Sequence, residues 1–358
     1  MTPVLSPTSA AAPAPLLEIR DLHTHFFTPR GVMKAVNGVS LAVRRGEILA
    51  VVGESGCGKS VTAMSVLKLI ATPPGRIVKG EILFEGRDLV PLTDRAMQEV
   101  RGEGIGMIFQ EPMTSLNPVL TVGEQIAETL IRHKRLSRRE AREKAVGLLD
   151  LVGLSDPSRR VGQYPHELSG GMRQRVVIAM AIACDPKLLI ADEPTTALDV
   201  TVQAQILDLL MEMRDRLGMG LVIITHDLGV VAETADRVAV MYAGRKVEEA
   251  GVQELFAQPR HPYTQGLIRA TPDGGIAAGP RIAGRRPPRL TEIPGMVPPL
   301  DRMPDGCAFA PRCPHAIEAC RAAVPPLERA GGTHAVACIR SGETFAHKRV
   351  PHAVEAHA

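Results

Sequence analysis

The segment ILAVVGESGCGKSVTAMSVLKLI, residues 48–70, constrains the fold of this chain more than any other. Its first five residues form an apolar, largely β-branched run, which is typical of a buried parallel strand. GESGCGKS at 53–60 then matches the phosphate-loop pattern G-x-x-x-x-G-K-[ST], and the residues after it have helical periodicity. A strand, a glycine-rich turn and a helix in this order predict an α/β fold that binds a nucleoside triphosphate.

Each residue type in this loop suits the binding of phosphate. The glycines let the backbone turn its N–H groups toward anionic oxygens, Lys59 adds a charge at the β- and γ-phosphates, and Ser60 can bind Mg²⁺. Cys57 stands where the backbone does the binding, so we expect no thiol chemistry from it. The predicted nucleotide contacts in this segment are Gly53, Glu54, Ser55, Gly56, Cys57, Gly58, Lys59, Ser60 and Val61.

Other apolar runs also end in polar side chains. LLIA, in KLLIADEP, is followed by Asp192 and Glu193, at the carboxyl end of a predicted strand where ligands of open α/β sheets gather. Asp192 suits the Mg²⁺ shell, and Glu193 is placed to orient or deprotonate an attacking water. For an isolated strand, an acidic pair that caps the next helix would be an equal alternative. The strand in GLVIITHDL ends at Thr225-His226, and His226 is a predicted γ-phosphate sensor. IGMIFQ ends at Gln110, a fourth polar residue that caps an apolar strand.

HELSGGMRQRVVIAMAIACDP, residues 166–186, resembles the signature of ABC transporters, which is normally written LSGGQ. The other segments then fall into the order of an ABC nucleotide-binding domain: phosphate loop, Q-loop at Gln110, signature, LLIADEP, D-loop TALD with Asp199, and switch at His226. The resemblance implies that Gln110 is a catalytic and Mg²⁺-binding residue. The resemblance covers roughly residues 16–270. It implies a P-loop ABC nucleotide-binding domain, with a mixed sheet, helices and an inserted helical subdomain over about 111–171.

The resemblance also implies contacts that one chain cannot complete. The signature would bind the ATP held by a partner's phosphate loop, through Ser169, Gly170, Gly171 and Met172. Met172 replaces the usual Gln, and we expect little loss because Ser169 and the glycine backbone carry most of the contact. The aromatic ring that stacks on adenine should be Phe27, with Phe26 as the rival because the strand register is not determined by the sequence.

The stretch between Gln110 and the signature is helical and charged. TVGE at 121–124 and SRRE at 137–140 are capping boxes that predict two helix starts. The basic residues of the second helix could indicate a nucleic-acid contact, but Glu140 and Glu143 interrupt them, so a solvated face is the better interpretation. In the ABC family this subdomain, with the Q-loop, receives the coupling helix of a membrane subunit.

HPYTQGLIRATP at 261–272 and IPGMVPPLDRMPDGCAFAPRCPHAIEAC at 293–320 are similar to the C-terminal region of ATP-binding subunits of oligopeptide and dipeptide importers. The similarity implies a peripheral ATPase at the cytoplasmic face of the bacterial inner membrane, energising peptide import. Its partners would be two transmembrane permeases, an extracytoplasmic binding protein and a second, non-identical ABC ATPase. Nickel and glutathione importers share these features. A soluble ABC ATPase acting on ribosomes or DNA is a weaker alternative, because such proteins usually carry two cassettes.

The composition agrees with these expectations. A net charge of +3, no Trp and 3% aromatic residues argue against nucleic acid as a partner. No run approaches the ~18 apolar residues of a membrane helix, and residues 1–15 lack a signal-peptide pattern. We expect a disordered tail over 1–15, the ATPase over 16–270, a linker over 271–292, a Cys-containing extension over 293–340 and a second tail over 341–358.

Four of the six cysteines lie in the extension: Cys307, Cys313, Cys320 and Cys338. Their spacing, C-x₅-C-x₆-C-x₁₇-C, lacks the C-x₂₋₄-C pair of structural zinc sites, so a [4Fe–4S] cluster is favoured over Zn²⁺ or four buried thiols. Such a centre would stabilise the fold of a segment that is too small to form a stable hydrophobic core alone. Arg312, His315 and Arg321 could bond the sulfur atoms or form surface charge.

Overall fold

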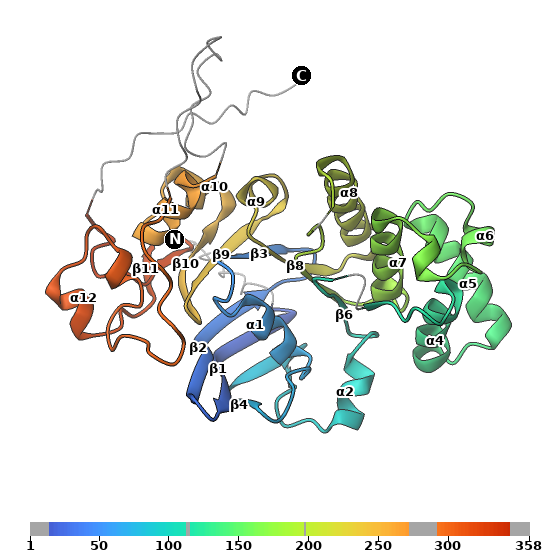
Figure 1. The fold of residues 1–358 in the computed structure, drawn as a ribbon, viewed down its shortest axis with the longest axis horizontal. Coiled ribbons are helices and arrows are strands. Elements are labelled where there is room, and N and C mark those ends of the chain that lie inside the picture. The colour runs from blue at the N-terminus through green and yellow to red at the C-terminus, as the bar shows by residue number, and fades with distance from the viewer. Residues whose placement is uncertain (1–13, 112–114, 197, 272–291, 344–358) are drawn as a thin grey trace, which may run out of the picture.

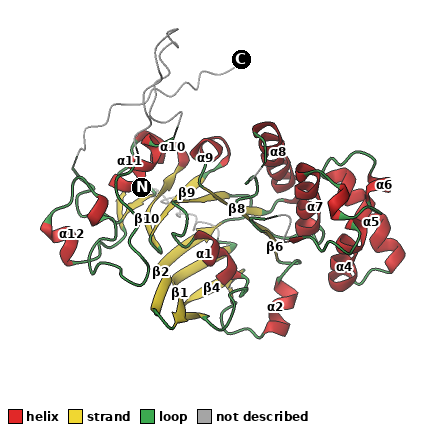
Figure 2. Ribbon diagram, viewed as in Figure 1, coloured by secondary structure: helices red, strands yellow, loops and turns green. Residues whose placement is uncertain are grey.

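The structure is a computed structural model that describes residues 14–111, 115–196, 198–271 and 292–343. Within these residues the chain forms an eight-stranded sheet, a four-stranded sheet and helices on both sides of the larger sheet (Figures 1 and 2). Most of the tails expected over 1–15 and 341–358, and most of the linker expected over 271–292, lie outside the described residues. A P-loop α/β fold with a mixed sheet, as the sequence predicts, is therefore present.

The larger sheet has the strand order β11-β12-β10-β9-β3-β8-β7-β6. Strands β9, β3, β8, β7 and β6 pair in parallel, and β10, β12 and β11 continue the sheet antiparallel beyond β9. The strands are β3 (Ile48–Val52), β6 (Ile105–Ile108), β7 (Leu188–Asp192), β8 (Gly220–Thr225), β9 (Arg237–Tyr242), β10 (Arg245–Gly251), β11 (Glu328–Gly331) and β12 (His334–Val336).

The parallel strands are buried on both faces, which explains their continuous apolar sequences. In β3, Ile48, Ala50 and Val52 pack into one core, and Leu49 and Val51 pack into the core on the opposite face. The first core continues into the helical region and the C-terminal extension, and the second lies under the smaller sheet.

The smaller sheet is antiparallel, with the order β2-β1-β4-β5. Its strands are β1 (Leu17–Thr28), β2 (Gly31–Val43), β4 (Gly75–Phe84) and β5 (Arg87–Asp88). It packs beside α1 (Lys59–Val66), where the hydroxyl groups of Thr24 and Ser65 are hydrogen-bonded at 2.8 Å. The sheet thus forms one wall next to the phosphate-loop helix (Figure 1).

The described helices fall into groups along the chain. Near the small sheet lies α2 (Asp94–Val100). The helical region comprises α4 (Val122–Lys134), α5 (Arg138–Leu151), α6 (Pro157–Arg160), the 3₁₀ turn η1 (Pro165–Glu167) and α7 (Gly170–Ile182). The remaining helices are α8 (Val200–Leu217), α9 (Leu228–Thr234), α10 (Val252–Ala257), α11 (Pro262–Arg269), the 3₁₀ turn η2 (Ala310–Arg312) and α12 (Glu318–Ala322).

The helical region and the C-terminal extension occupy opposite ends of the molecule, with the sheets between them (Figure 1). Both predicted capping boxes are confirmed: Thr121 and Glu124 cap α4, and Ser137 and Glu140 cap α5. In each box the side chains satisfy backbone N–H groups that the first helical turn leaves unpaired. The local sequence therefore determines where these two helices begin.

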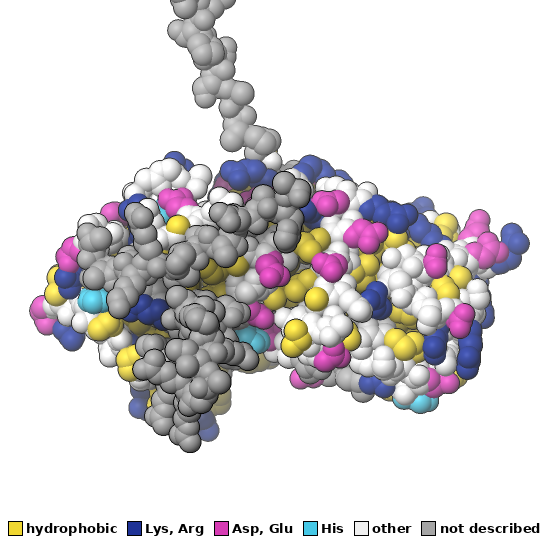
Figure 3. Space-filling view, turned by 90° about the horizontal axis from the view of Figure 1, so that it is seen from above, with side chains coloured by type: hydrophobic (Ala, Val, Ile, Leu, Met, Phe, Trp, Pro, Cys, Tyr) yellow, Lys and Arg dark blue, Asp and Glu magenta, His cyan; other side chains and the backbone are white. Residues whose placement is uncertain are grey.

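Charged side chains of both signs are interspersed on the face that Figure 3 shows, rather than forming a field of one sign. This distribution fits the small net charge of +3. Among the described residues, none of the helices combines the length and the apolar character that crossing a bilayer requires.

Candidate functional site

The phosphate loop leaves the carboxyl end of β3 and enters α1, as the motif predicts. Lys59 is buried, and its Nζ donates hydrogen bonds to the carbonyl oxygens of Gly53 at 2.7 Å and Glu54 at 3.2 Å. The ammonium group therefore lies inside the curve of the loop, where it can meet phosphate oxygens.

Glycine is required at two points of this loop. Gly53 has φ +151°, and a Cβ there would lie 2.2 Å from the carbonyl oxygen of Met241. Gly58 has φ +102°, and a Cβ there would lie 2.3 Å from the carbonyl oxygen of Ala35. Both contacts are with backbone atoms, so any side chain would displace the loop or a neighbouring strand.

Cys57 faces the protein interior from the same loop. Its side chain is buried, and burial raises the pKa of the thiol. Lys59 Nζ lies 3.8 Å from its sulfur. A buried thiol that stays protonated acts as a packing group, and the contribution of Cys57 through its backbone stays a prediction.

The carboxylate of Asp192 meets the start of α1 at the end of β7. Ser60 Oγ donates to Asp192 Oδ1 at 3.1 Å, and the Asp192 side chain is buried. Burial raises the pKa of Asp192, and the hydrogen bond from Ser60 and the charge of Lys59 oppose that rise. Two oxygen atoms of the kind that bind a hard divalent cation thus lie side by side.

Polar side chains from the ends of neighbouring parallel strands contact Glu193. Its carboxylate accepts a hydrogen bond from Gln110 Nε2 at 3.0 Å, beyond β6, and His226 Nδ1, beyond β8, lies 3.4 Å from it. The structure therefore brings together the three residues that the sequence nominates as catalytic. The Glu193 backbone has φ +48°, and its N–H donates to the carbonyl of Ile224 at 2.9 Å.

Thr196 belongs to the same cluster and is absent from the sequence prediction. Its Oγ1 donates to Glu193 Oε2 at 2.9 Å, so one carboxylate oxygen accepts from both Thr196 and Gln110. The spacing of three residues after Glu193, typical of a turn with side-chain bonding, is the only signal that could have indicated it.

The side chain of His226 remains 68% exposed, whereas that of Glu193 is 14% exposed, so the imidazole borders open space next to the carboxylate.

The signature begins α7, away from the phosphate loop in the fold (Figure 1). Ser169 is the N-cap, and its Oγ accepts from the N–H of Met172 at 3.4 Å. Ser169 and Gly170 are exposed, and a Cβ at Gly171 would lie 2.8 Å from Val202 of α8. Asp199 caps α8 by accepting from the N–H of Val202 at 2.9 Å. The signature thus begins α7 and the D-loop aspartate precedes α8, and the starts of these two helices are neighbours.

The two candidate adenine-stacking rings lie together on β1. Phe27 is 44% exposed, and the guanidinium carbon of Arg76 lies 5.1 Å from its ring centroid. Phe26 is half-buried and faces Gly75, where an added Cβ would come within 2.9 Å of its ring. The more accessible ring is that of Phe27.

The four cysteines of the extension line one cavity of about 20 Å³, together with His315 and other residues. All four are free thiols, and burial raises the pKa of Cys338 to about 11. In the part of the chain that the structure describes, no group of three or more His, Cys, Asp or Glu side chains is placed to hold one metal ion. The thiols therefore share a cavity without converging on a single point.

Arg312 has neither of the two roles that the sequence suggested for it, a hydrogen bond to sulfur or a surface charge. Its side chain is 5% exposed, so it is not surface charge, and its donors go to oxygen atoms rather than to sulfur. Nη1 and Nη2 donate to the two carboxylate oxygens of Glu54 in the phosphate loop, at 2.7 and 3.0 Å. The N–H of Glu54 is also engaged, because it donates to the hydroxyl of Tyr263 at 2.8 Å. Arg321, by contrast, is on the surface.

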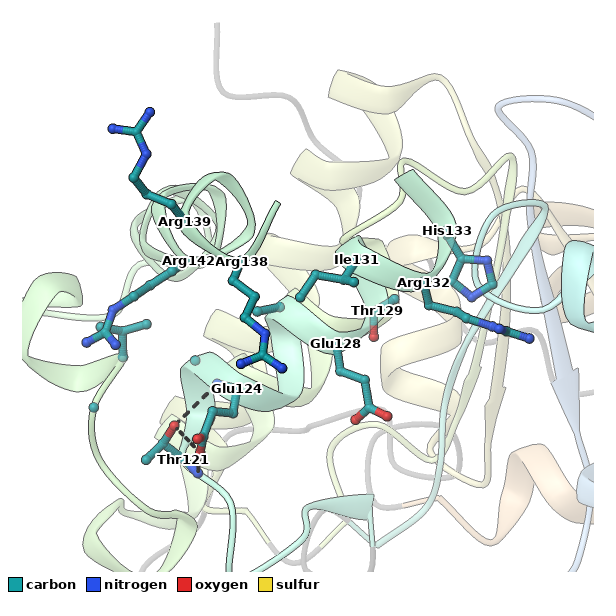
Figure 4. Close-up of a pocket in the computed structure, with 14 residues that line it drawn as sticks. Thr121, Glu124, Glu128, Thr129, Ile131, Arg132, His133, Arg138, Arg139 and Arg142 are labelled. Carbon is teal, nitrogen blue, oxygen red and sulfur yellow. Dashed lines mark hydrogen bonds between the residues drawn. The ribbon is translucent and has the colours of Figure 1, made fainter. Parts of the chain in front are cut away.

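A wide surface hollow of about 1220 Å³ lies in the helical region, far along the chain from the phosphate loop. It is bordered by α4 and α5, and Figure 4 shows side chains of both helices around it. Arg132, Arg138, Arg139 and Arg142 line it together with Glu124 and Glu128. No phosphate-loop or strand-end residue contributes to it, so it is separate from the site at Glu193.

Known proteins resemble the chain over nearly its full length. A family model for ABC transporters matches residues 36–196, and one for the oligopeptide/dipeptide transporter C-terminal region matches residues 247–320. A probable peptide ABC transporter ATP-binding protein of Sinorhizobium fredii is 57% identical over 92% of this chain and 96% of that protein. The oligopeptide transport ATP-binding protein OppD of Bacillus subtilis is 54% identical over 90% of this chain and 87% of that protein.

Solved structures agree with these matches. A dimeric ATP-binding cassette in a post-hydrolysis state, bound to ADP and phosphate, is 28% identical with a TM-score of 0.60, covering 66% of this chain and 98% of that one. The strand order, the phosphate loop beside Asp192 and Glu193, and both family matches point to one group of proteins. The chain belongs to the ATP-binding proteins of oligopeptide/dipeptide-type ABC transporters.

Proposed function

We propose that this chain binds and hydrolyses ATP to energise the import of di- and oligopeptides through an ABC transporter at the cytoplasmic face of the plasma membrane. Curated relatives that are 48–57% identical are named as peptide, oligopeptide or dipeptide transport ATP-binding proteins. The observation that carries the proposal is the cluster at the strand ends, where Gln110 and His226 flank Glu193 beside the Ser60–Asp192 pair.

Glu193 is proposed to orient the water that attacks the γ-phosphate. A carboxylate held by two neutral donors, Gln110 and Thr196, has a defined direction and keeps acceptor capacity for a water proton. His226 is exposed next to it and is proposed to contact the γ-phosphate as the switch residue. Positioning of this kind is the main contribution a protein makes to phosphoryl transfer.

The residues present fit a magnesium ion. Ser60 Oγ and Asp192 Oδ1 are 3.1 Å apart, and hydroxyl and carboxylate oxygens are the ligands that Mg²⁺ prefers. We propose Ser60, Asp192 and the amide of Gln110 as the side chains that hold it. Bound there, Mg²⁺ would supply positive charge against the β- and γ-phosphates.

The phosphate loop, residues 53–60, is proposed to cradle the phosphates with its backbone N–H groups, and Lys59 to balance their charge. Phe27 is proposed to stack on adenine, with Phe26 as the alternative. The signature residues Ser169, Gly170, Gly171 and Met172, with Asp199, are proposed to complete the nucleotide site of a second cassette.

Subunits of oligopeptide importers work with permeases and a substrate-binding protein. We propose two transmembrane permeases, an extracytoplasmic binding protein and a second, non-identical ABC ATPase as the partners of this chain. The helical subdomain, about residues 111–171, is proposed to contact a permease. Uptake of labelled peptides, Ni²⁺ and glutathione by the whole assembly distinguishes peptide cargo from the alternatives.

The hydrolytic assignment is tested by Glu193→Gln in the assembled transporter. The variant should bind ATP with near wild-type affinity, while its turnover should fall roughly 10²-fold or more because the water-orienting carboxylate is lost. Glu233→Gln, at an exposed position of α9, is the matched control and should hydrolyse ATP normally. Near-normal hydrolysis by Glu193→Gln would contradict the proposed role.

We also propose that Cys307, Cys313, Cys320 and Cys338 hold a [4Fe–4S] cluster, with Zn²⁺ as the alternative. The support is that the side chains of all four cysteines line one cavity, although these residues are not placed to hold a single metal ion. A single Zn²⁺ requires four ligands about 2.3 Å from one point. A cluster instead offers a separate iron corner to each thiolate, which suits thiols that surround a common space.

The metal proposal is tested on protein purified anaerobically. About four iron atoms per chain and a broad absorbance near ~400 nm would support the cluster. Removing one ligand by Cys320→Ser should lower the iron content, whereas Cys184→Ser, at a buried cysteine outside the extension, should not. Stoichiometric zinc, or no metal in protein kept anaerobic throughout, would reject the cluster.

A further inference from the structure

The phosphate loop is held from the C-terminal extension by an ion pair with two hydrogen bonds. Arg312 is the last residue of η2, 258 positions from Glu54 in the sequence. Its two terminal nitrogens donate to the two carboxylate oxygens of Glu54, at 2.7 and 3.0 Å. A paired arrangement of this type specifies direction as well as attraction, because the planar guanidinium matches the planar carboxylate.

Arg312 is itself fixed by its surroundings. Nε donates to the carbonyl of Pro294 at 3.0 Å, and Nη2 to the carbonyl of Ile293 at 3.2 Å. The guanidinium carbon lies 5.8 Å from the ring centroid of Tyr242 and 5.9 Å from that of Phe309. The guanidinium that binds the loop is therefore held by residues of the extension and by Tyr242 of β9.

The backbone of Glu54 is also held by a residue that is distant in the sequence. Its N–H donates to the hydroxyl of Tyr263, a buried residue of α11, at 2.8 Å. The ring of Tyr263 lies 4.7 Å from that of Tyr242 and 5.5 Å from that of Phe309, measured between centroids. On its other side, the Glu54 carbonyl accepts from Lys59 Nζ at 3.2 Å. A shift of Glu54 would thus move an acceptor of the lysine that faces the phosphates.

A loop of this composition needs such anchoring. Gly53, Gly56 and Gly58 all have positive φ, at 151°, 77° and 102°. Glycine loses more conformational freedom on ordering than any other residue, so a free loop would bear that cost when nucleotide binds. A tether that orders the loop beforehand strengthens binding by removing this cost from the binding step.

We propose that Arg312 is a positioning residue for nucleotide binding: through Glu54, the C-terminal extension holds the phosphate loop in its binding conformation. ATP affinity then depends on a part of the chain that never touches the nucleotide. The inference rests on the proposed function of the loop as the ATP site. Because Phe309 and Cys313 on either side of Arg312 also line the thiol cavity, one short segment joins that cavity to the phosphate loop.

The test measures the affinity of the full chain for MgATP by calorimetry. Arg312→Met and Glu54→Gln should each weaken binding about tenfold, and the double variant should be no weaker than the single ones, because each change removes the same pair. Arg312→Lys should lie between wild type and Arg312→Met, since an ammonium keeps the charge but not the two-pronged geometry. Arg329→Met, at an exposed arginine of β11 in the same extension, is the matched control and should bind normally.

A kinetic readout separates positioning from general support of the fold. In the assembled transporter, Arg312→Met should raise KM for ATP about tenfold and leave kcat close to wild type, because Glu193 and its partners are untouched. A tenfold loss of kcat with an unchanged KM for ATP would contradict the inference. If Arg312→Met fails to fold, Arg312→Lys decides the question, and a wild-type affinity for MgATP in that variant would contradict the inference.

The Lys59→Ala variant shows whether a negative result contradicts the positioning role of Arg312 or the assignment of the loop as the ATP site. If Lys59→Ala loses MgATP binding while Glu54→Gln binds like wild type, the loop is the ATP site and the positioning role is wrong. If Lys59→Ala also binds like wild type, the assignment of the loop itself is wrong.

Discussion

His261 shows how burial determines the charge of a single side chain. It is 2% exposed at the start of α11, and its Nδ1 accepts the N–H of Tyr263 at 3.1 Å. Burial lowers its pKa to about 4, although the nearby Glu248 acts in the opposite direction. The neutral imidazole can accept this bond, whereas the imidazolium cannot, so the folded state opposes protonation.

The pKa of His261 predicts a pH dependence of stability. The ordinary His pKa is 6.5, so between pH 6.5 and 4 the unfolded chain binds a proton that the folded chain does not. Stability is therefore retained above this window and lost as the pH falls through it, by about 3 kcal/mol. Urea unfolding of the full chain from pH 7 to 4.5 measures it.

The matched variant is His261→Asn, whose side-chain oxygen can accept the same N–H without titrating in this range. Its free energy of unfolding should fall less steeply with decreasing pH than that of the wild type. The same slope in both proteins would show that another group carries the effect.

At the scale of elements, parallel strands account for most of the site. The carboxyl ends of β3, β6, β7 and β8 lie at one edge of the sheet, and a polar residue or the phosphate loop begins within two residues of each strand end. Residues separated by 83 positions, Gln110 and Glu193, therefore come within 3.0 Å. The regular geometry of the sheet, rather than any local signal, produces this contact.

The extension joins the sheet through an element that local patterns do not reveal. β12 has three residues, and it pairs with β10, placing His334 beside Glu248. His334 Nε2 lies 2.7 Å from Glu248 Oε1, and both side chains are fully buried. Backbone pairing covers the edge of β10, which would otherwise present unpaired N–H and C=O groups.

At the scale of the whole molecule, the exposed signature and the phosphate loop lie on separate elements, α7 and α1 (Figure 1). Ser169 and Gly170 are exposed, and the resemblance of the sequence to ABC transporters predicts that they contact nucleotide. A solved cassette similar to this chain is described as dimeric. We therefore expect each chain to contribute its signature to the nucleotide of a partner.

This arrangement predicts opposite effects of two substitutions. Lys59→Ala should weaken nucleotide binding by this chain itself. Ser169→Ala should leave that binding intact and impair hydrolysis at the site completed by the partner's phosphate loop. Binding by the isolated chain and hydrolysis by the assembly, measured for both variants, make the comparison. Loss of ATP binding by the isolated Ser169→Ala chain would refute the two-chain site.

Local patterns in the sequence determined the elements that depend on neighbouring residues. The phosphate loop, the buried strands around it and the two capping boxes are readable because strand hydrophobicity, glycine geometry and N-capping act over a few residues. The residues around Glu193 were readable for the same reason, since Glu193 and His226 directly follow apolar strands and Gln110 lies two residues after one. Thr196 was missed because a hydroxyl three residues further on is common in turns that have no function.

Only the tertiary structure decided which distant groups meet. Arg312 was expected near sulfur or at the surface, and it instead binds Glu54 across 258 residues. The four cysteines line one cavity, but their sulfur atoms do not converge on one ion, which spacing alone could not show. Such contacts depend on how β10, β12 and α11 pack against the core. Long-range packing is a property of the whole fold, because each contact forms only after every intervening element has been placed.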